Sequence, residues 1–380
     1  MPTKESSAQR NLPRNSEEVP DTVEADLPGL VQRTLAEYLD ARLVEAVELD
    51  PGFADAAREL SAFVLGGGKR IRPTFAWWAW RAAGGDPEGP EAPAVARAAS
   101  ALELIQACAL VHDDLIDESD TRRGNPTVHR RFAGAHDRER WRGGAQQFGM
   151  SAAVLLGDLA LAWADDMLHS SGLAPQALAR ALGPWRAMRT EMLAGQYLDV
   201  FSQVRGDESA EAALRVAELK AASYTVARPL QLGAEIAGAD ERTLSALQRF
   251  GHDIGVAFQL RDDLLGVFGD PEVTGKPAGD DLREGKRTLL IAEAVEAARA
   301  QGDERAMDRV RAVLGDPDAA EEAIEDARTA LCRLGADAAV EHRIARLTSS
   351  AVSALHSAEL AEPAATRLSE LAVAVTDRTR

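Results

Sequence analysis

The chain is poor in cysteine and in positive charge, and each shortage excludes a class of protein. Cys108 and Cys332 are its two cysteines in 380 residues, too few for a disulfide framework or a thiolate metal site, which favours a reducing cytoplasm. Lysine and arginine number 43 against 61 acidic residues, a net charge of −18, so we expect no nucleic-acid partner. No stretch reaches the roughly 18 apolar residues of a membrane span, so we expect no integral membrane segment.

Alternating β-branched runs are also scarce, which predicts an all-α fold. From about Leu27 onward, apolar residues recur at three- and four-residue spacing, and alanine and leucine dominate. We expect residues 27–380 to form one large helical domain and the polar, proline-containing residues 1–26 to form a disordered leader. The expected helix breaks, marked by glycine, proline and aspartate, lie near residues 50–52, 84–87, 121–144, 183–184, 238–240, 269–285 and 315–317.

Two acidic clusters are the strongest sign of a functional site. Asp113 and Asp117 stand four residues apart in a helical segment, so they project from one face while Asp114 points aside. The pair Asp262-Asp263 follows far downstream. Carboxylates at the end of a helix oppose its dipole, so a merely solvated acidic end is unfavourable. The two clusters suit Mg²⁺ ions that carry a phosphate ester.

Cationic side chains follow each acidic cluster. Arg122 and Arg123 come after the first cluster, and Lys276 and Lys286 come after the second. Guanidinium groups present forked donors that match phosphate oxygens. This local reversal of sign in an acidic protein indicates an anionic ligand.

A glycine-rich run, Gly66 to Pro73, precedes both clusters. It lacks the spacing and the serine or threonine of a Walker motif. Lys69 and Arg72 nevertheless place two charges on one face at the start of a helix, where anions bind well.

The remaining conspicuous side chains suit packing. His112 lies beside the first cluster, but Mg²⁺ prefers oxygen ligands, so we expect a packed neighbour. Trp77, Trp78 and Trp80 are expected in the core or an interface.

Taken in order, these segments resemble the trans-isoprenyl diphosphate synthases, also called polyprenyl synthetases. Several ordered motifs at matching intervals, spanning about Gly66 to Arg287, are far more specific than any one of them. The motifs are Gly67-Gly68-Lys69-Arg70-Ile71-Arg72-Pro73, Asp113-Asp114-Leu115-Ile116-Asp117, Thr121-Arg122-Arg123-Gly124, Lys220, Gln259, Asp262-Asp263 and Thr274-Gly275-Lys276.

The resemblance implies a bundle of long helices around a deep central cavity, the isoprenoid synthase fold, usually as a homodimer. It also implies head-to-tail condensation of an allylic diphosphate with isopentenyl diphosphate, assisted by two or three Mg²⁺ ions. The metal-binding residues would be Asp113, Asp117, Asp262 and Asp263. The residues for the allylic diphosphate would be Arg122, Lys220, Lys276 and Lys286, with Gln259 as a further substrate-binding residue. The residues for isopentenyl diphosphate would be Lys69, Arg72, Gln106 and Arg123.

Two positions depart from the family pattern. Ala221 follows Lys220 where a threonine is common, which removes a hydroxyl contact with the substrate. Gly266 stands where the last aspartate of the second motif is expected, so we consider Asp270 or Asp281 as a replacement.

Product length is the finest prediction. In the family, side chains four and five residues before the first aspartate form the floor of the cavity, and here these are the small Ala109 and Cys108. A helix rises 1.5 Å per residue, so the space extends by at least another turn, to Ile105 as the next barrier. We therefore predict geranylgeranyl diphosphate as product, with farnesyl or a longer polyprenyl diphosphate as alternatives.

Three other functions remain as alternatives. A class I terpene cyclase would replace the second aspartate pair by an Asn/Ser/Glu motif and would leave Lys69 and Arg72 without a second diphosphate. A non-catalytic regulatory subunit of a synthase would have lost Asp113 or Asp117, and both are present. A metal-dependent phosphohydrolase needs further histidine ligands beside His112.

Overall fold

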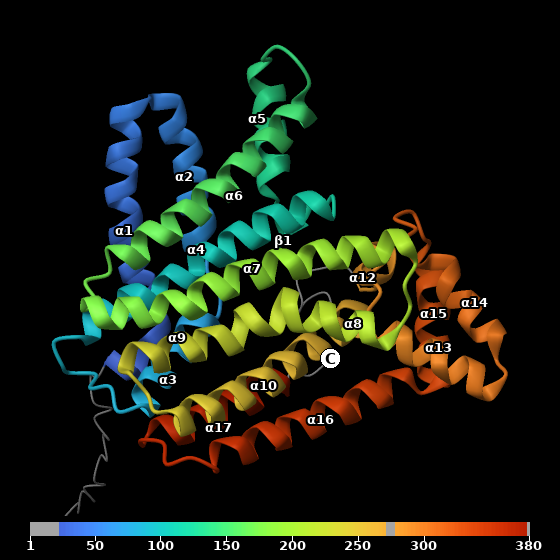
Figure 1. The fold of residues 1–380 in the computed structure, drawn as a ribbon. Coiled ribbons are helices and arrows are strands. Elements are labelled where there is room, and N and C mark those ends of the chain that lie inside the picture. Colours follow the sequence, from blue (N-terminus) through green and yellow to red (C-terminus); the bar gives the residue numbers. More distant parts are fainter. Residues whose placement is uncertain (1–22, 271–277, 378–380) are drawn as a thin grey trace, which may run out of the picture.

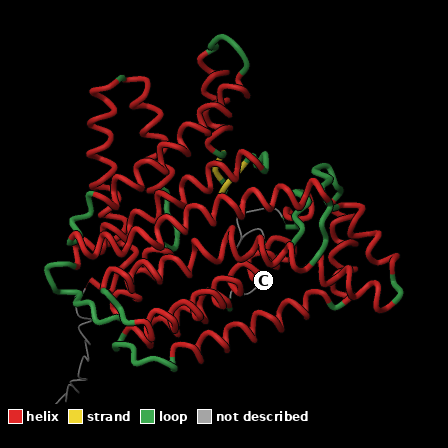
Figure 2. The backbone as a smooth tube through the Cα atoms, in the orientation of Figure 1, coloured by secondary structure: helices red, strands yellow, loops and turns green. Residues whose placement is uncertain are grey.

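The computed structural model describes residues 23–270 and 278–377, and nearly all of them lie in helices (Figures 1 and 2). Within these residues, the strands are limited to β1 (Thr121–Arg122) and β2 (Asn125–Pro126), which pair as an antiparallel hairpin. The predicted all-α fold is confirmed. The described helices are η1 (Val23–Asp26), α1 (Leu27–Leu49), α2 (Pro51–Leu65), α3 (Ile71–Ala82), α4 (Ala92–Ile116), α5 (Val128–Glu139), α6 (Ala145–His169), α7 (Pro175–Arg205), α8 (Ala210–Val216), η2 (Ala217–Ala227), α9 (Arg228–Ala237), α10 (Glu241–Phe268), α12 (Asp280–Arg283), α13 (Leu289–Gln301), α14 (Glu304–Val313), α15 (Glu321–Leu334), α16 (Ala336–Leu355) and α17 (Ala364–Thr376).

Local sequence sets many of the helix ends. Asp50 ends α1 and caps α2, where its carboxylate accepts hydrogen bonds from the backbone N–H groups of Gly52 and Phe53. Pro51 takes the first position of α2, where a missing N–H costs nothing. Gly238 adopts the left-handed conformation that ends α9. These are breaks that the sequence predicts.

Three predicted boundaries are wrong or incomplete. Gly183-Pro184 does not interrupt α7, because burial of Pro184 and Trp185 against the core outweighs the lost backbone hydrogen bond. Residues 121–144 are not one irregular stretch, since α5 occupies their middle. The last residues of the predicted leader form η1, whose Glu24 accepts a hydrogen bond from Arg81, so the fold starts before Leu27.

Two hydrophobic cores share helix α10. The larger core surrounds α4, which packs on α6, α3, α1, α9 and α7. The smaller core joins α13 to α16 with the second half of α10. In Figure 1, α13, α14 and α15 lie at one end of the molecule, and α16 runs from there along its lower side. Phe250 and Ile254 belong to the larger core, whereas Leu260 and Leu264 belong to the smaller one. Asp262 and Asp263 therefore lie on a helix that packs into both cores.

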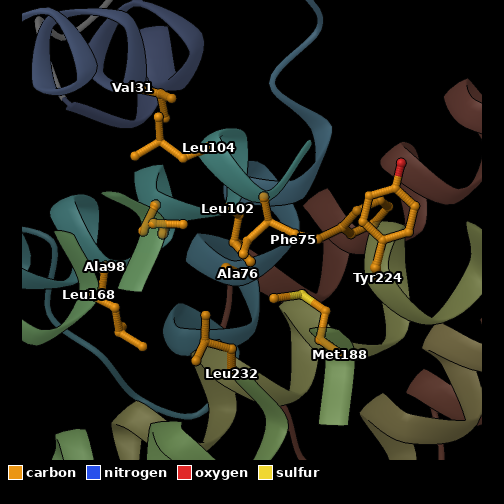
Figure 3. Packing of buried hydrophobic residues seen from close by; sticks show 14 of the residues in the cluster. Val31, Phe75, Ala76, Ala98, Leu102, Leu104, Leu168, Met188, Tyr224 and Leu232 are labelled. Atoms are coloured by element: carbon orange, nitrogen blue, oxygen red, sulfur yellow. The ribbon is translucent and has the colours of Figure 1, made fainter. Parts of the chain in front are cut away.

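The larger core is close-packed between α1, α3, α4, α7 and α9. Figure 3 shows Val31 of α1 facing Leu104 of α4, and Leu102 lying beside Phe75 and Ala76 of α3. The three tryptophans of α3 are each at most 4% exposed, which confirms the packing prediction for them. This core holds the first acidic cluster at the end of α4.

Two helices, α4 and α6, have the length and apolar composition of a membrane span, contrary to the expectation that no stretch reaches that size. The apolar window of α4 is 72% buried inside the fold, so packing accounts for its composition. The window of α6 is only 39% buried, and its outer face carries exposed apolar side chains.

Candidate active site

A cavity of about 910 Å³ lies between the ends of α4, α10, η2 and the loop before α3, near the upper end of the usual range for ligand pockets. Its lining brings together most of the predicted site residues, although they come from segments far apart in the chain. These are Lys69, Arg72, Gln106, Asp113, Arg122, Arg123, Lys220, Gln259, Asp262, Asp263 and Lys286. Lys276 lies outside the described residues.

The first acidic cluster ends α4. Asp117 is the C-cap, and its backbone N–H donates to the carbonyl of Asp113 over 2.8 Å. The ammonium group of Lys220 lies 3.1 Å from Oδ1 of Asp113, and that of Lys286 lies 3.5 Å from Oδ2 of Asp117. Each carboxylate of the helical face thus has a lysine in contact with it.

The pKa values of the two carboxyl groups move apart. Burial favours the neutral form of Asp113, but the charges of Lys220, Lys286 and Arg122 outweigh it and hold its pKa well below the usual range. Burial and the charge of Asp113 raise the pKa of Asp117. Burial opposes the charge of Lys220, yet Asp113 and Asp199 raise its pKa. The positive charges of Lys220, Lys286 and Arg122 therefore offset the negative charges of this cluster.

Asp114 points away from this face, as predicted. Its side chain is 1% exposed and accepts a hydrogen bond of 2.7 Å from Nε of Arg122. Nη2 of Arg122 lies 3.6 Å from Oδ2 of Asp113, so the same guanidinium reaches the cavity. Asp114 therefore positions an arginine.

The β1–β2 hairpin places the second arginine. Its turn residues, Arg123 and Gly124, both have positive φ angles, as a tight hairpin turn requires. Nη1 of Arg123 donates to the carbonyl of Gly67 over 2.8 Å. The hairpin is thereby joined to the glycine-rich loop that precedes α3.

The start of α3 carries a buried cation. Arg72 is 7% exposed, lies 4.1 Å from the ring centroid of Tyr224, and donates to Oγ1 of Thr225 over 2.8 Å. Tyr224 and Thr225 belong to η2, a π-helical segment that also carries Lys220. Such irregular turns are frequent at functional sites.

The two members of the second acidic cluster differ in burial, since Asp262 is exposed and Asp263 is buried. Asp263 is 8% exposed and accepts a hydrogen bond of 2.6 Å from Nε2 of Gln259. Burial, with the charges of Asp281 and Asp262, raises the pKa of Asp263 well above its usual value. Gly266 also lines the cavity, and the carboxylate of Asp281 fills the space beside it.

Two polar residues of α7 complete the site and were missed in the sequence. Asp199 is 8% exposed and accepts a hydrogen bond of 2.6 Å from Lys220, and Gln196 donates to Asp113 over 3.2 Å. Their three-residue spacing puts both on one helical face. The preceding Gly195 allows α7 to approach η2 closely, since a Cβ at this position would lie 2.1 Å from the backbone N of Lys220.

The predicted chain-length residues do not line this cavity. Cys108 and Ile105 are buried in the larger core and Ala109 is half-buried beside it, whereas α4 presents Gln106 and Leu110 to the cavity. His112 faces α6, where Nε2 lies 3.2 Å from the carbonyl of Val154. It is the packed neighbour that the sequence predicts.

The donor set fits hard cations. Carboxylate oxygens are the ligands that Mg²⁺ prefers, and Asp113, Asp262 and Asp263 line one cavity. Asp117 is outside this lining and contacts Lys286. Within residues 23–270 and 278–377, no three such side chains are placed to hold one ion. The ammonium groups of Lys220 and Lys286 contact the carboxylates of Asp113 and Asp117.

Comparisons with known proteins identify the family of the chain. Residues 55–331 match the polyprenyl synthetase family model. The chain is 32% identical to a short chain isoprenyl diphosphate synthase of Methanothermobacter thermautotrophicus, over 76% of this chain and 80% of the relative. It is 38% identical to a geranylgeranyl diphosphate synthase of Mycobacterium tuberculosis, over 60% of this chain and 59% of the relative.

A solved structure is similar over almost the whole chain. Geranylgeranyl pyrophosphate synthase from Corynebacterium glutamicum, complexed with isoprenyl diphosphate and magnesium, shares 46% identity with a TM-score of 0.90 and covers 93% of this chain and 99% of its own. The ordered motifs, the helical fold and these similarities agree: the chain belongs to the polyprenyl synthetase family.

Proposed function

We propose that the protein is a Mg²⁺-dependent trans-prenyltransferase that joins an allylic diphosphate to isopentenyl diphosphate and makes geranylgeranyl diphosphate. The observation that carries this proposal is the meeting of two acidic clusters and two lysines, Lys220 and Lys286, at one cavity. Acidic groups alone would suit a metal, and lysines alone would suit an anion. Acidic groups and lysines at one cavity together suit a diphosphate that carries metal ions.

Asp113, Asp117 and Asp262 are the proposed metal ligands, with Asp263 beside them. Bound Mg²⁺ would neutralise charge on the diphosphate as it leaves. When the diphosphate enters, Lys220 and Lys286 exchange their carboxylate partners for phosphate oxygens. The carboxylates released in this exchange become available to the metal.

The cationic residues divide between the two substrates. Arg122, Lys220, Lys276 and Lys286 hold the allylic diphosphate, with Gln259 beside the second cluster. Lys69, Arg72, Gln106 and Arg123 hold isopentenyl diphosphate. The contact of Arg123 with the glycine-rich loop supports this division, because it brings the loop's cations and Arg123 to one side of the cavity.

Apolar side chains supply the dry part of the cavity. Leu110, Ala217, Ala221 and Phe258 line it alongside the charged groups. An allylic carbocation formed there is protected from water until the double bond of isopentenyl diphosphate attacks it. No protein nucleophile is needed, and the released diphosphate accepts the final proton.

The product assay tests this function directly. Purified protein is incubated with Mg²⁺, isopentenyl diphosphate and allylic primers of five, ten or fifteen carbons, and products are sized by chromatography. We expect a twenty-carbon product from each primer. No elongation of any primer would refute the synthase function, and a fifteen-carbon or a longer end product would refute the proposed length.

Ala109 is the sharper test of the proposed floor. Neither residue lines the cavity described above, and the two differ in burial. A phenylalanine at Cys108 would overpack a residue that is 1% exposed, which typically costs about 1–3 kcal/mol, whereas Ala109 is half-buried. We expect Ala109→Phe to shorten the product with little change in melting temperature. An unchanged product length would contradict the floor assignment.

We propose that the enzyme is a cytoplasmic homodimer whose interface includes the outer face of α6. Leu155 is 67% exposed and Val154 is 43% exposed on this helix, more apolar surface than solvent favours. A second copy would cover it. Sedimentation velocity should give a dimer for wild type and a monomer for Leu155→Glu, with Glu139→Gln as an exposed control.

A further inference from the structure

Arg287 lines the cavity but belongs to neither proposed group of diphosphate-binding residues. It stands between Lys286 and Thr288, and all three residues line the cavity just before α13 begins. The Arg287 side chain is only 18% exposed, so the protein encloses most of it. Guanidinium groups present forked donors that match phosphate oxygens. A further cation thus lies at the cavity next to a lysine of the proposed allylic group.

Two buried donors of this segment have no hydrogen-bond partner within residues 23–270 and 278–377. They are Nε of Arg287 and Oγ1 of Thr288. Thr288 is the N-cap residue of α13, where a threonine side chain ordinarily accepts a hydrogen bond from the first turn, yet it makes no such bond. Buried polar atoms are rarely left unpaired in folded proteins. Unpaired donors on neighbouring cavity residues indicate a ligand that is rich in acceptors.

Glu208, in the loop between α7 and α8, holds the guanidinium of Arg287. Oε1 of Glu208 lies 3.0 Å from Nη1 of Arg287, and its Oε2 lies 2.9 Å from Nη2 of Arg311 on α14. Neither Glu208 nor Arg311 lines the cavity, and the Arg311 side chain is 38% exposed. Glu208 would therefore keep a cationic partner if Arg287 turned toward a ligand.

We propose that Arg287 binds the allylic diphosphate together with Lys286, and that Glu208 competes with this diphosphate for the Arg287 guanidinium. When the substrate enters, Arg287 exchanges Glu208 for phosphate oxygens, and Glu208 remains paired with Arg311. A diphosphate carries several negative charges against one on Glu208, so the exchange favours the bound substrate. The inference rests on the proposed prenyltransferase function and deepens it.

The two ends of the Arg287–Glu208 ion pair should affect ligand binding in opposite directions. The measurement is isothermal titration calorimetry with inorganic diphosphate and Mg²⁺. Arg287→Gln should weaken diphosphate binding about 10-fold or more, because it removes a charge-assisted hydrogen bond. Glu208→Gln should strengthen binding, because it removes the competing anion. Arg311→Gln breaks the other contact of Glu208 outside the cavity, and it should change binding less than about threefold.

A purely structural role of the ion pair predicts that Arg287→Gln and Glu208→Gln weaken binding alike and lower the melting temperature alike. That result, or wild-type diphosphate binding by Arg287→Gln, overturns the inference and leaves the proposed function standing. Arg287→Lys keeps the positive charge, so it should fold and bind diphosphate more tightly than Arg287→Gln; binding as weak as that of Arg287→Gln would count against a charge contact.

The primer assay identifies which diphosphate Arg287 meets. Arg287→Gln should raise the KM of the allylic primer and leave the KM of isopentenyl diphosphate unchanged. A rise in the KM of isopentenyl diphosphate alone would overturn the assignment to the allylic substrate. Absence of diphosphate binding by wild type in the presence of Mg²⁺ would instead refute the proposed function itself.

Discussion

Removing one partner of the buried Arg70–Glu103 ion pair should destabilise the protein more than removing one partner of any surface ion pair. Nη1 of Arg70 lies 2.6 Å from Oε2 of Glu103, and the two side chains are 4% and 3% exposed. Arg70 also donates to Gln32 and to the carbonyl of Val64. Arg70→Met leaves a buried carboxylate without its cation, which costs about 3–5 kcal/mol.

The expected shift in melting temperature follows from chain length. Unfolding entropy near 2.1 cal/mol/K per residue gives about 0.8 kcal/mol/K for 380 residues in the two-state limit. Arg70→Met and Glu103→Leu should each lower the midpoint by about 4–6 °C. The double variant should lose less than either single variant, because no uncompensated charge remains.

Differential scanning calorimetry at neutral pH measures these shifts, and a surface pair provides the control. Arg131 pairs with Glu59, and both side chains are at least 40% exposed. Arg131→Met should change stability by less than about 1 kcal/mol. The reasoning fails if Arg70→Met shifts the midpoint no more than Arg131→Met, or if the double variant loses the sum of the single shifts.

Two further predictions concern the site and its floor. Asp113→Asn should lower the rate of product formation at least about 100-fold in the primer assay, because it removes a proposed metal ligand that also pairs with Lys220; a rate within a few-fold of wild type would contradict that role. Burial raises the pKa of the Cys108 thiol to about 12, with a smaller contribution from Asp158. Since the thiolate is the reactive form, iodoacetamide at about pH 8.5 should modify exposed Cys332 in the folded protein and both cysteines after unfolding. Rapid labelling of folded Cys332→Ser would show that Cys108 is open to the cavity.

The local part of the site was predictable because helical spacing decides it. Asp113 and Asp117 share a face at any well-formed helix end, and Asp114 must then point aside. The hairpin turn at Arg123-Gly124 likewise follows a local conformational preference for glycine. Such features need no knowledge of the partners across the cavity.

Contacts between distant segments were not predictable in the same way. Asp199 and Gln196 acquire their meaning only when α7 packs against η2 and brings them to Lys220 and Asp113. Pro184 was expected to end a helix, since its local effect is unfavourable, yet tertiary packing prevails there. The position of the Asp281 carboxylate beside Gly266 likewise depends on how α12 packs on α10.

Lys220 and Lys286 explain why several carboxylates of the site can be buried. Burial raises the pKa of Lys286's neighbours Asp117 and Asp263 and would by itself favour their neutral forms. Asp117 and Asp281 share the charge of Lys286, and Asp113 and Asp199 share that of Lys220. A metal ion at Asp113 and Asp117 would leave Lys220 with Asp199, and Lys286 with Asp281 and Glu284, as their remaining partners. A diphosphate would give both lysines new anionic partners. Metal and diphosphate should therefore each strengthen the binding of the other, by the same factor.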